Sequence, residues 1–153
     1  MKYSVKILWE RKESDIFTNN KYSRKHKWIF DCGLEIPASS SPQVVPLPMS
    51  DESAVDPEEA FVASLSSCHM LFFLSIAAAK NYCVEAYSDN AEGLMGKDEN
   101  EKIVMLSVSL YPVVLFSGSN IPEEEEINEM HKSAHNKCYI ANSVKTVVKV
   151  IPS

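Results

Sequence analysis

The chain has 153 residues, with 15 basic and 21 acidic side chains, a net charge of −6 and a pI near 5.2. Its length allows one domain with a hydrophobic core and is short for two independent ones. The acidic balance argues against nucleic acid or an anionic membrane surface as a main partner, because both require concentrated Lys and Arg. We therefore expect a soluble, acidic protein with a single domain over residues 1–153.

The N-terminal part of the chain is predicted to be extended. Residues 3–11 carry apolar side chains at odd positions from 3 to 9, which is the period-two pattern of a half-buried strand. The segment has neither the apolar core nor the cleavage site of a signal peptide, so we expect a cytoplasmic protein. Residues 22–37 predict a hairpin, in which Gly33 permits the turn.

A long helix is predicted after an irregular loop. Residues 38–56 are rich in Ser, Pro and acidic side chains and show little periodicity, which indicates a surface loop. Pro57 suits the first position of a helix, Asp56 suits its N-cap, and two glutamates follow in the first turn. The helix should extend to about Asn81.

The stretch from Ala60 to Ala79 contains no charged residue if its histidine is neutral, and it reaches the roughly 20 residues that cross a bilayer. A membrane span is therefore one interpretation. Several polar residues lie at its centre, namely Ser64, Ser66, Ser67, Cys68 and His69, and no basic cluster flanks it, which argues against a span. A helix that is apolar on nearly all sides can instead be buried in a large core or in a dimer.

The C-terminal half predicts an α+β arrangement. Residues 83–92 and 102–115 favour strands that pair through the connection from Gly93 to Asn100, and residues 144–151 favour a closing strand. A second helix begins near Pro122. Helical spacing places five of its side chains on one core-facing stripe, namely Ile127, Met130, His131, Ala134 and Cys138.

The chain contains four cysteines, Cys32, Cys68, Cys83 and Cys138. Without an export signal a disulfide framework is not favoured, and buried or catalytic thiols are expected. Cys68, inside the long helix, is either inert core or a nucleophile. A nucleophilic thiol must lose its proton, and because its ordinary pKa is roughly 8.5, a nearby cation or helix N-terminus must assist.

Neighbouring side chains could supply that assistance. His69 is adjacent to Cys68, but successive helical residues diverge by roughly 100°, so we expect His69 to pack or face solvent. Glu58 lies roughly 80° around the helix from Cys68. A carboxylate alone would raise the pKa of the thiol, so Glu58 is useful only if it holds an arginine that also touches the sulfur. Of the two arginines, Arg11 and Arg24, we favour Arg24.

Three segments carry recognisable motifs: residues 56–59 (DPEE), 63–69 (ASLSSCH) and 135–144 (HNKCYIANSV). They resemble the cysteine motifs of the OsmC/Ohr family, which comprises osmotically inducible and organic-hydroperoxide-resistance proteins. Residues 22–33 (YSRKHKWIFDCG) and 37–39 (PAS) also resemble the OsmC-like branch, so the resemblance covers nearly the whole chain.

The resemblance implies an antioxidant, thiol-dependent peroxidase that reduces organic hydroperoxides and hydrogen peroxide. Cys68 would attack the distal peroxide oxygen and become a sulfenic acid, and Cys138 would condense with it to a redox-active disulfide. Arg24 would stabilise the thiolate and the developing alkoxide, while Glu58 would hold the guanidinium in a bidentate ion pair. No metal, haem or flavin cofactor is implied.

The resemblance also implies a fold and partners. Family members are intertwined α+β homodimers, in which antiparallel sheets pack on two main helices and the two sites lie at the subunit interface. The external reductant is a dithiol, in some members a lipoyl-bearing protein. Many relatives carry glycine at the position of Cys32, and Cys83 is an additional cysteine. Neither is expected to act in turnover.

Two other functions stay open. His131, His135 and Cys138 place three potential zinc ligands along one side of the second helix, although no nearby fourth ligand completes the set. In a non-enzymatic, stress-related binding dimer, both motif cysteines would be core residues, which is common for cysteine.

Overall fold

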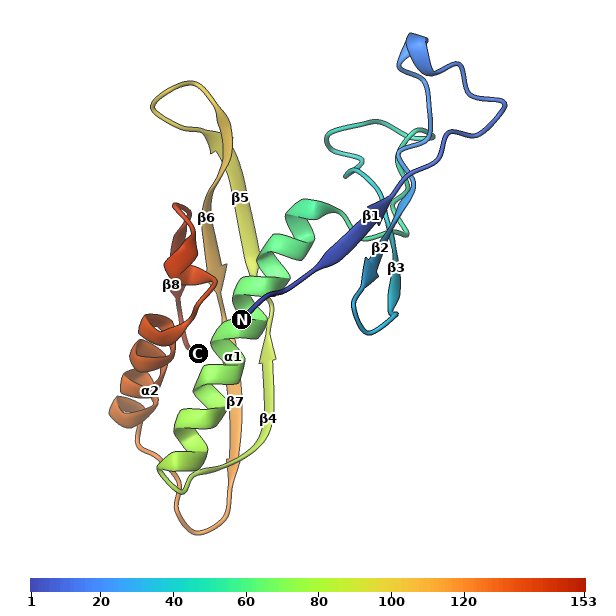
Figure 1. Ribbon diagram of the computed structural model, residues 1–153. Helices are drawn as coiled ribbons and strands as arrows, with labels where there is room; N and C mark the ends of the chain where they lie inside the picture. The colour runs from blue at the N-terminus through green and yellow to red at the C-terminus, as the bar shows by residue number, and fades with distance from the viewer. The chain divides into compact units, whose positions relative to one another are not determined.

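The computed structural model describes all 153 residues, and its contacts divide the chain into two compact units, residues 1–60 and 61–153. The first unit holds a small sheet and a long loop. The second holds the remaining strands and most of both helices (Figure 1). The single domain over residues 1–153 stays a prediction.

The first unit is built on a three-stranded antiparallel sheet in the order β1 (Val5–Leu8), β2 (His26–Phe30), β3 (Glu35–Ala38). A short 3-10 helix, η1 (Phe17–Asn19), lies in the β1–β2 connection. The predicted hairpin is confirmed, because β2 pairs with β3 around Gly33, whose φ is +85°. The predicted burial of the first strand is wrong: Val5 and Ile7 are 52% and 56% exposed, because β1 is the edge strand of a small sheet and Ala38 is the only buried hydrophobic residue of the first unit.

Helix α1 (Pro57–Ala79) begins where the sequence predicted. The Asp56 carboxylate accepts a hydrogen bond of 2.7 Å from the backbone N–H of Glu59, and the Glu59 side chain accepts one of 3.5 Å from the backbone N–H of Asp56. This reciprocal pair satisfies two donors that a helix start leaves open. The helix ends before Asn81, which adopts a φ of +61°.

The second unit contains two sheets made from five strands, β4 (Cys83–Asp89), β5 (Glu92–Lys97), β6 (Ile103–Leu110), β7 (Pro112–Ser117) and β8 (Val147–Val150). One sheet pairs β4 with β7, and the other has the order β5-β6-β8. All pairings are antiparallel except β6 with β8, which is parallel. The α+β class with antiparallel sheets and two helices is confirmed, with this one parallel exception.

Strand β5 replaces the connection that was predicted from Gly93 to Asn100, so that prediction was wrong. β5 pairs along its whole length with β6. A side chain on Gly93 would lie 2.7 Å from both the Met105 sulfur and Val62 Cγ2, so this strand position accepts only glycine without a shift of its neighbours. Gly93 is therefore required by contacts across the unit.

Helix α2 (Glu124–Lys137) starts with a capping box between Glu123 and Glu126 and is followed by the 3-10 helix η2 (Ala141–Ser143). The predicted core stripe is confirmed: Met130, Ala134 and Cys138 are at most 1% exposed.

Helix α1 forms the centre of both hydrophobic clusters. In the first, Phe73 and Ala77 pack with Met130 and Ala134 of α2 and with the β4–β7 sheet. In the second, the buried members are Leu65, Val108 and Leu110, surrounded by residues of β6, β8 and η2. In Figure 1, α2 lies beside the C-terminal part of α1, in agreement with these contacts.

By length and composition, α1 also qualifies as a membrane span, with 22% of the relevant window buried within the chain. The core helix of a soluble protein meets the same criteria. Within the second unit α1 makes two specific polar contacts that a lipid-facing helix would lack, through Ser66 and His69.

Two histidines are part of this core. Nε2 of His69 and Nδ1 of His131 share a hydrogen bond of 3.0 Å, with the two rings stacked at an angle of 6°. The residues are 1% and 3% exposed. Burial lowers the pKa of His69 to about 4, with a further lowering by His135 and an opposing effect of the Asp89 carboxylate. Burial, followed by the effect of His69, lowers the pKa of His131 to about 4.

These shifts predict a stability that depends on pH. Between pH 6.5, the ordinary pKa, and pH 4, the unfolded chain binds more protons at His69 and His131 than the folded chain does. The free energy of unfolding should therefore fall as the pH is lowered from 6.5 to 4. Urea unfolding at several pH values measures this.

The variant His69→Gln removes one titrating group and should show a shallower fall than the wild type. A free energy of unfolding that stays level from pH 7 to pH 4 in the wild type would contradict the prediction.

Candidate thiol site

The two cysteines of the predicted motifs meet in the second unit. Cys68, on α1, and Cys138, at the end of α2, are neighbouring free thiols, and the Cys68 side chain raises the pKa of Cys138. Cys68 is half-buried, whereas Cys138 is 1% exposed. Of the two cysteine residues, only Cys68 is partly open to solvent.

The backbone at the end of α2 holds Cys138 in place. Cys138 is the C-cap of the helix, and its N–H donates to the carbonyl of His135 at 3.2 Å. The backbone N–H of Ala141, the first residue of η2, donates to the Cys138 sulfur at 3.4 Å. The sulfur is thus fixed between the last turn of α2 and the start of η2.

The environment of Cys138 favours its protonated form. Burial, followed by the neighbouring Cys68 side chain, raises the pKa of the Cys138 thiol to about 11, while the N–H of Ala141 acts in the opposite direction. At neutral pH Cys138 therefore keeps its proton, because burial disfavours the charged thiolate.

A polar contact fixes α1 to the sheet close to Cys68. The Ser66 hydroxyl donates to the Asp89 carboxylate at 2.5 Å, and the backbone N–H of Tyr111 donates to the other oxygen at 2.6 Å. Asp89 thus links the helix, two residues before Cys68, to the junction between β6 and β7. Sequence reasoning missed Asp89, because its partners are distant in the chain.

Arg24 makes only local contacts, all within the first unit. Its guanidinium lies 3.7 Å from the centre of the Tyr22 ring and donates to the carbonyls of Asn20 and Tyr22 and to the Asn20 side chain. The three ion pairs of the structure involve neither Arg24 nor Glu58. The expected Arg24–Glu58 ion pair is therefore not formed in this conformation, and the catalytic roles of these two residues stay predictions.

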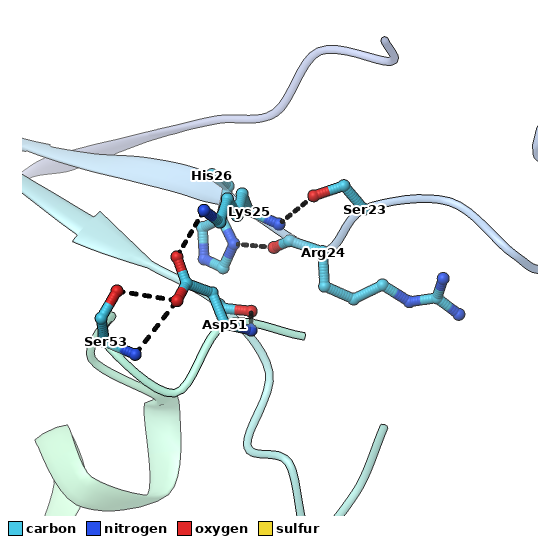
Figure 2. A network of polar contacts seen from close by, with 7 residues as sticks. Ser23, Arg24, Lys25, His26, Asp51 and Ser53 are labelled. Carbon is cyan, nitrogen blue, oxygen red and sulfur yellow. Dashed lines mark hydrogen bonds and ion pairs between the residues drawn. The ribbon is translucent and has the colours of Figure 1, made fainter. Parts of the chain in front are cut away.

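The side chain of Arg24 points away from a polar network that its neighbours form (Figure 2). Lys25 pairs with Asp51 at 2.7 Å, and Ser53 donates to the same carboxylate through its N–H and its hydroxyl. The hydrogen bond from Lys25, followed by those from Ser53, lowers the pKa of Asp51 to about 2. This network ties the start of β2 to the loop before α1, beside an open cavity of about 440 Å³.

The structure gathers no group of three or more His, Cys, Asp or Glu side chains that could hold a metal ion. Of the three residues considered as zinc ligands, His131 is bonded to His69, and Cys138 is in contact with Cys68. The predicted spacing along one helix therefore does not produce a ligand set.

Comparison with known proteins agrees with the sequence motifs. The family model for OsmC-like protein matches residues 50–153. Among solved structures, the OsmC-like protein of unknown function from Vibrio cholerae O1 biovar eltor is 52% identical, with a TM-score of 0.99, and the match covers 100% of this chain and 99% of that one. No curated protein sequence matches the chain.

More distant structures share the fold. The organic hydroperoxide resistance proteins of Elizabethkingia anophelis and Bacillus subtilis are 18% and 17% identical to the chain, each with a TM-score of 0.66. Both matches cover 99% of this chain, and they cover 95% and 98% of the respective relatives. From the family match and the 52% identity to the Vibrio protein, we conclude that the chain belongs to the family of OsmC-like proteins.

Proposed function

We propose that the protein is a thiol-dependent peroxidase that reduces organic hydroperoxides, in which Cys68 is the nucleophile and Cys138 resolves its sulfenic acid. One observation carries the proposal: two thiols 70 residues apart in the sequence are close enough for Cys68 to raise the pKa of Cys138, and Cys68 is half-buried whereas Cys138 is buried. Two relatives of the same fold are named organic hydroperoxide resistance proteins, which is consistent with it.

The first step is a two-electron oxidation of Cys68. Its thiolate attacks the distal oxygen of the hydroperoxide, the O–O bond breaks, and the alkoxide leaves as the alcohol after taking up a proton. Because Cys138 is 1% exposed and holds its proton, the oxidant is directed to Cys68.

The second step closes the disulfide. The sulfur of Cys138 loses its proton and attacks the sulfur of the Cys68 sulfenic acid, and the hydroxyl leaves as water. The proximity of the two thiols in the reduced protein supports this step. An external dithiol then reduces the disulfide.

Arg24 and Glu58 complete the proposed site. In the mechanism that the family resemblance implies, the guanidinium stabilises charge on the thiolate and on the leaving alkoxide. In the structure the Arg24 guanidinium donates hydrogen bonds to Asn20 and Tyr22. In the proposed role it would either exchange these hydrogen bonds or keep them while it stabilises the charge.

The proposed active form is a homodimer built on α1. The face opposite the buried stripe consists of small or apolar exposed residues without charge, namely Ala63, Ser67, Leu71 and Ser75. Leu71 is 61% exposed. Small side chains allow two helices to approach closely, and an uncharged exposed face of this kind is suited to a second copy of the same helix.

Removal of the nucleophile tests the reaction directly. Cys68→Ser should lower the dithiol-dependent consumption of cumene hydroperoxide to the rate without protein, because serine is not a nucleophile at neutral pH. Cys83→Ser, which alters an exposed thiol on β4, is the matched control and should keep the wild-type rate. Equal rates for wild type and Cys68→Ser would contradict the peroxidase function and leave the non-enzymatic dimer.

Cys138→Ser should complete one turnover and then stall or over-oxidise, because the Cys68 sulfenic acid then lacks its resolving thiol. Mass spectrometry of the oxidised protein would show this state.

Arg24→Ala should slow the first oxidation step by about 10²-fold, the size typical for one lost stabilising donor. Stopped-flow measurement of that step isolates the effect. Arg11→Ala is the matched control, because Arg11 also donates to backbone carbonyls of an exposed loop. If both variants lose the same amount of activity, the role of Arg24 is structural.

Leu71→Asp should convert the dimer to monomer, because it places a charge in the centre of the proposed helix–helix contact. Sedimentation velocity of the purified protein measures the change. Ile121→Asp, at a residue that is 51% exposed before α2, should leave the dimer intact. A wild type that sediments as a monomer would refute the dimer.

A further inference from the structure

The buried histidine pair is the one side-chain hydrogen bond between the two helices that carry the reactive thiols. His69 lies on α1 and His131 on α2, 62 residues apart in the sequence, and their ring nitrogens are 3.0 Å apart. The other contacts between these helices are apolar, among them Phe73 with Met130 and Ala134. Apolar contacts tolerate sliding and rotation, whereas a hydrogen bond requires a defined distance and direction.

The pair lies close to the thiols along both helices. His69 is the residue after Cys68, and Cys138 follows His131 by seven residues at the end of the same helix. Any rotation or axial shift of α2 against α1 that breaks the histidine contact therefore also moves one sulfur relative to the other. The ring of His131 is further held by stacking on Phe73, at 4.2 Å between ring centres.

This buried polar pair lowers the stability of the core. Nδ1 of His69 and Nε2 of His131 are buried without any hydrogen-bond partner. One of these two nitrogens carries a proton and the other a lone pair in either arrangement of the neutral rings. Each unpaired buried polar atom destabilises the fold, so an apolar pair would pack at lower cost. A function that depends on the direction of the contact explains why a polar pair occupies this place.

We propose that the hydrogen bond between His69 and His131 positions the redox pair, by holding α1 and α2 in the one arrangement in which the sulfurs of Cys68 and Cys138 can join. Both histidines are positioning residues, since neither contacts the reacting atoms. The use of this arrangement in turnover rests on the proposed peroxidase function. The ease with which Cys68 and Cys138 form a disulfide does not rest on that function, and it can be measured without any peroxide.

Equilibrium with glutathione provides the measurement. The thiolate of Cys68 attacks glutathione disulfide and releases one glutathione, and then Cys138 attacks Cys68 in the mixed disulfide and releases the second. Two electrons pass from the protein to glutathione, and the protons of the two protein thiols balance the two glutathione thiols that form. The equilibrium constant reports how well the protein aligns its sulfurs.

The test uses the full chain with Cys32→Ser and Cys83→Ser, so that only the two site thiols remain. At position 131, Asn places its amide nitrogen where Nδ1 lies and keeps the contact, whereas Gln places it near Nε2 and loses it. At position 69 the order is reversed, and Gln keeps the contact through the position of Nε2. These pairs are matched in polarity, so both members should fold alike.

Acid quenching, alkylation and mass spectrometry give the ratio of oxidised to reduced protein at set glutathione ratios. His131→Gln should lower the equilibrium constant about three- to tenfold relative to His131→Asn, which is the size of one net hydrogen bond. The equilibrium constant of His69→Asn should likewise be lower than that of His69→Gln. The packing control, Val108→Ala, alters a buried residue of β6 in the other hydrophobic cluster and should lower the free energy of unfolding while leaving the constant unchanged.

Equal constants within each pair, or the reverse order, would overturn the proposal. So would a loss in Val108→Ala as large as that in His131→Gln, since general loosening of the core would then explain the result. If the expected order is found but the protein consumes no hydroperoxide, the positioning role stands and the peroxidase function fails.

Discussion

The buried stripe of α1, formed by Leu65, His69, Phe73 and Ala77, organises the second unit. Leu65 belongs to one hydrophobic cluster and Phe73 and Ala77 belong to the other, so the same helix face joins two sheets and α2. Cys68 lies beside this stripe rather than within it. It is therefore held by a rigid element and still half-exposed, which is what a thiol that meets a small oxidant requires.

The two thiols of the candidate site differ in their burial, and this difference involves no added charge. Cys68 lies at the margin of the core, whereas Cys138 lies inside it. Burial and the neighbouring Cys68 raise the pKa of Cys138 and favour its protonated form, whereas Cys68 is partly open to solvent. The division of roles in the proposed scheme would follow from this difference in burial.

Much of the local structure could be predicted from the sequence, because its causes are local. The start of α1 at Asp56 and Pro57, and the turn at Gly33, depend on nearby residues and are confirmed. Strand β5 could not be predicted, because Gly93 is required by Met105 and Val62, which are distant in the sequence. The histidine pair was missed for the same reason. The pairing of the thiols came from a family resemblance, since no rule of spacing brings residue 68 to residue 138.

The topology also gives the proposed disulfide a thermodynamic meaning. Cys138 lies in the connection between β7 and β8, and the sheets hold both ends of that connection, through β4 and β6. A bond from Cys68 to Cys138 would close a covalent loop of about 70 residues, and restricting the unfolded chain in this way stabilises the fold by roughly 4 kcal/mol. Oxidation would then also raise the stability of the fold. The oxidised chain would be harder to unfold and to degrade than the reduced one, so the lifetime of the protein would depend on its redox state.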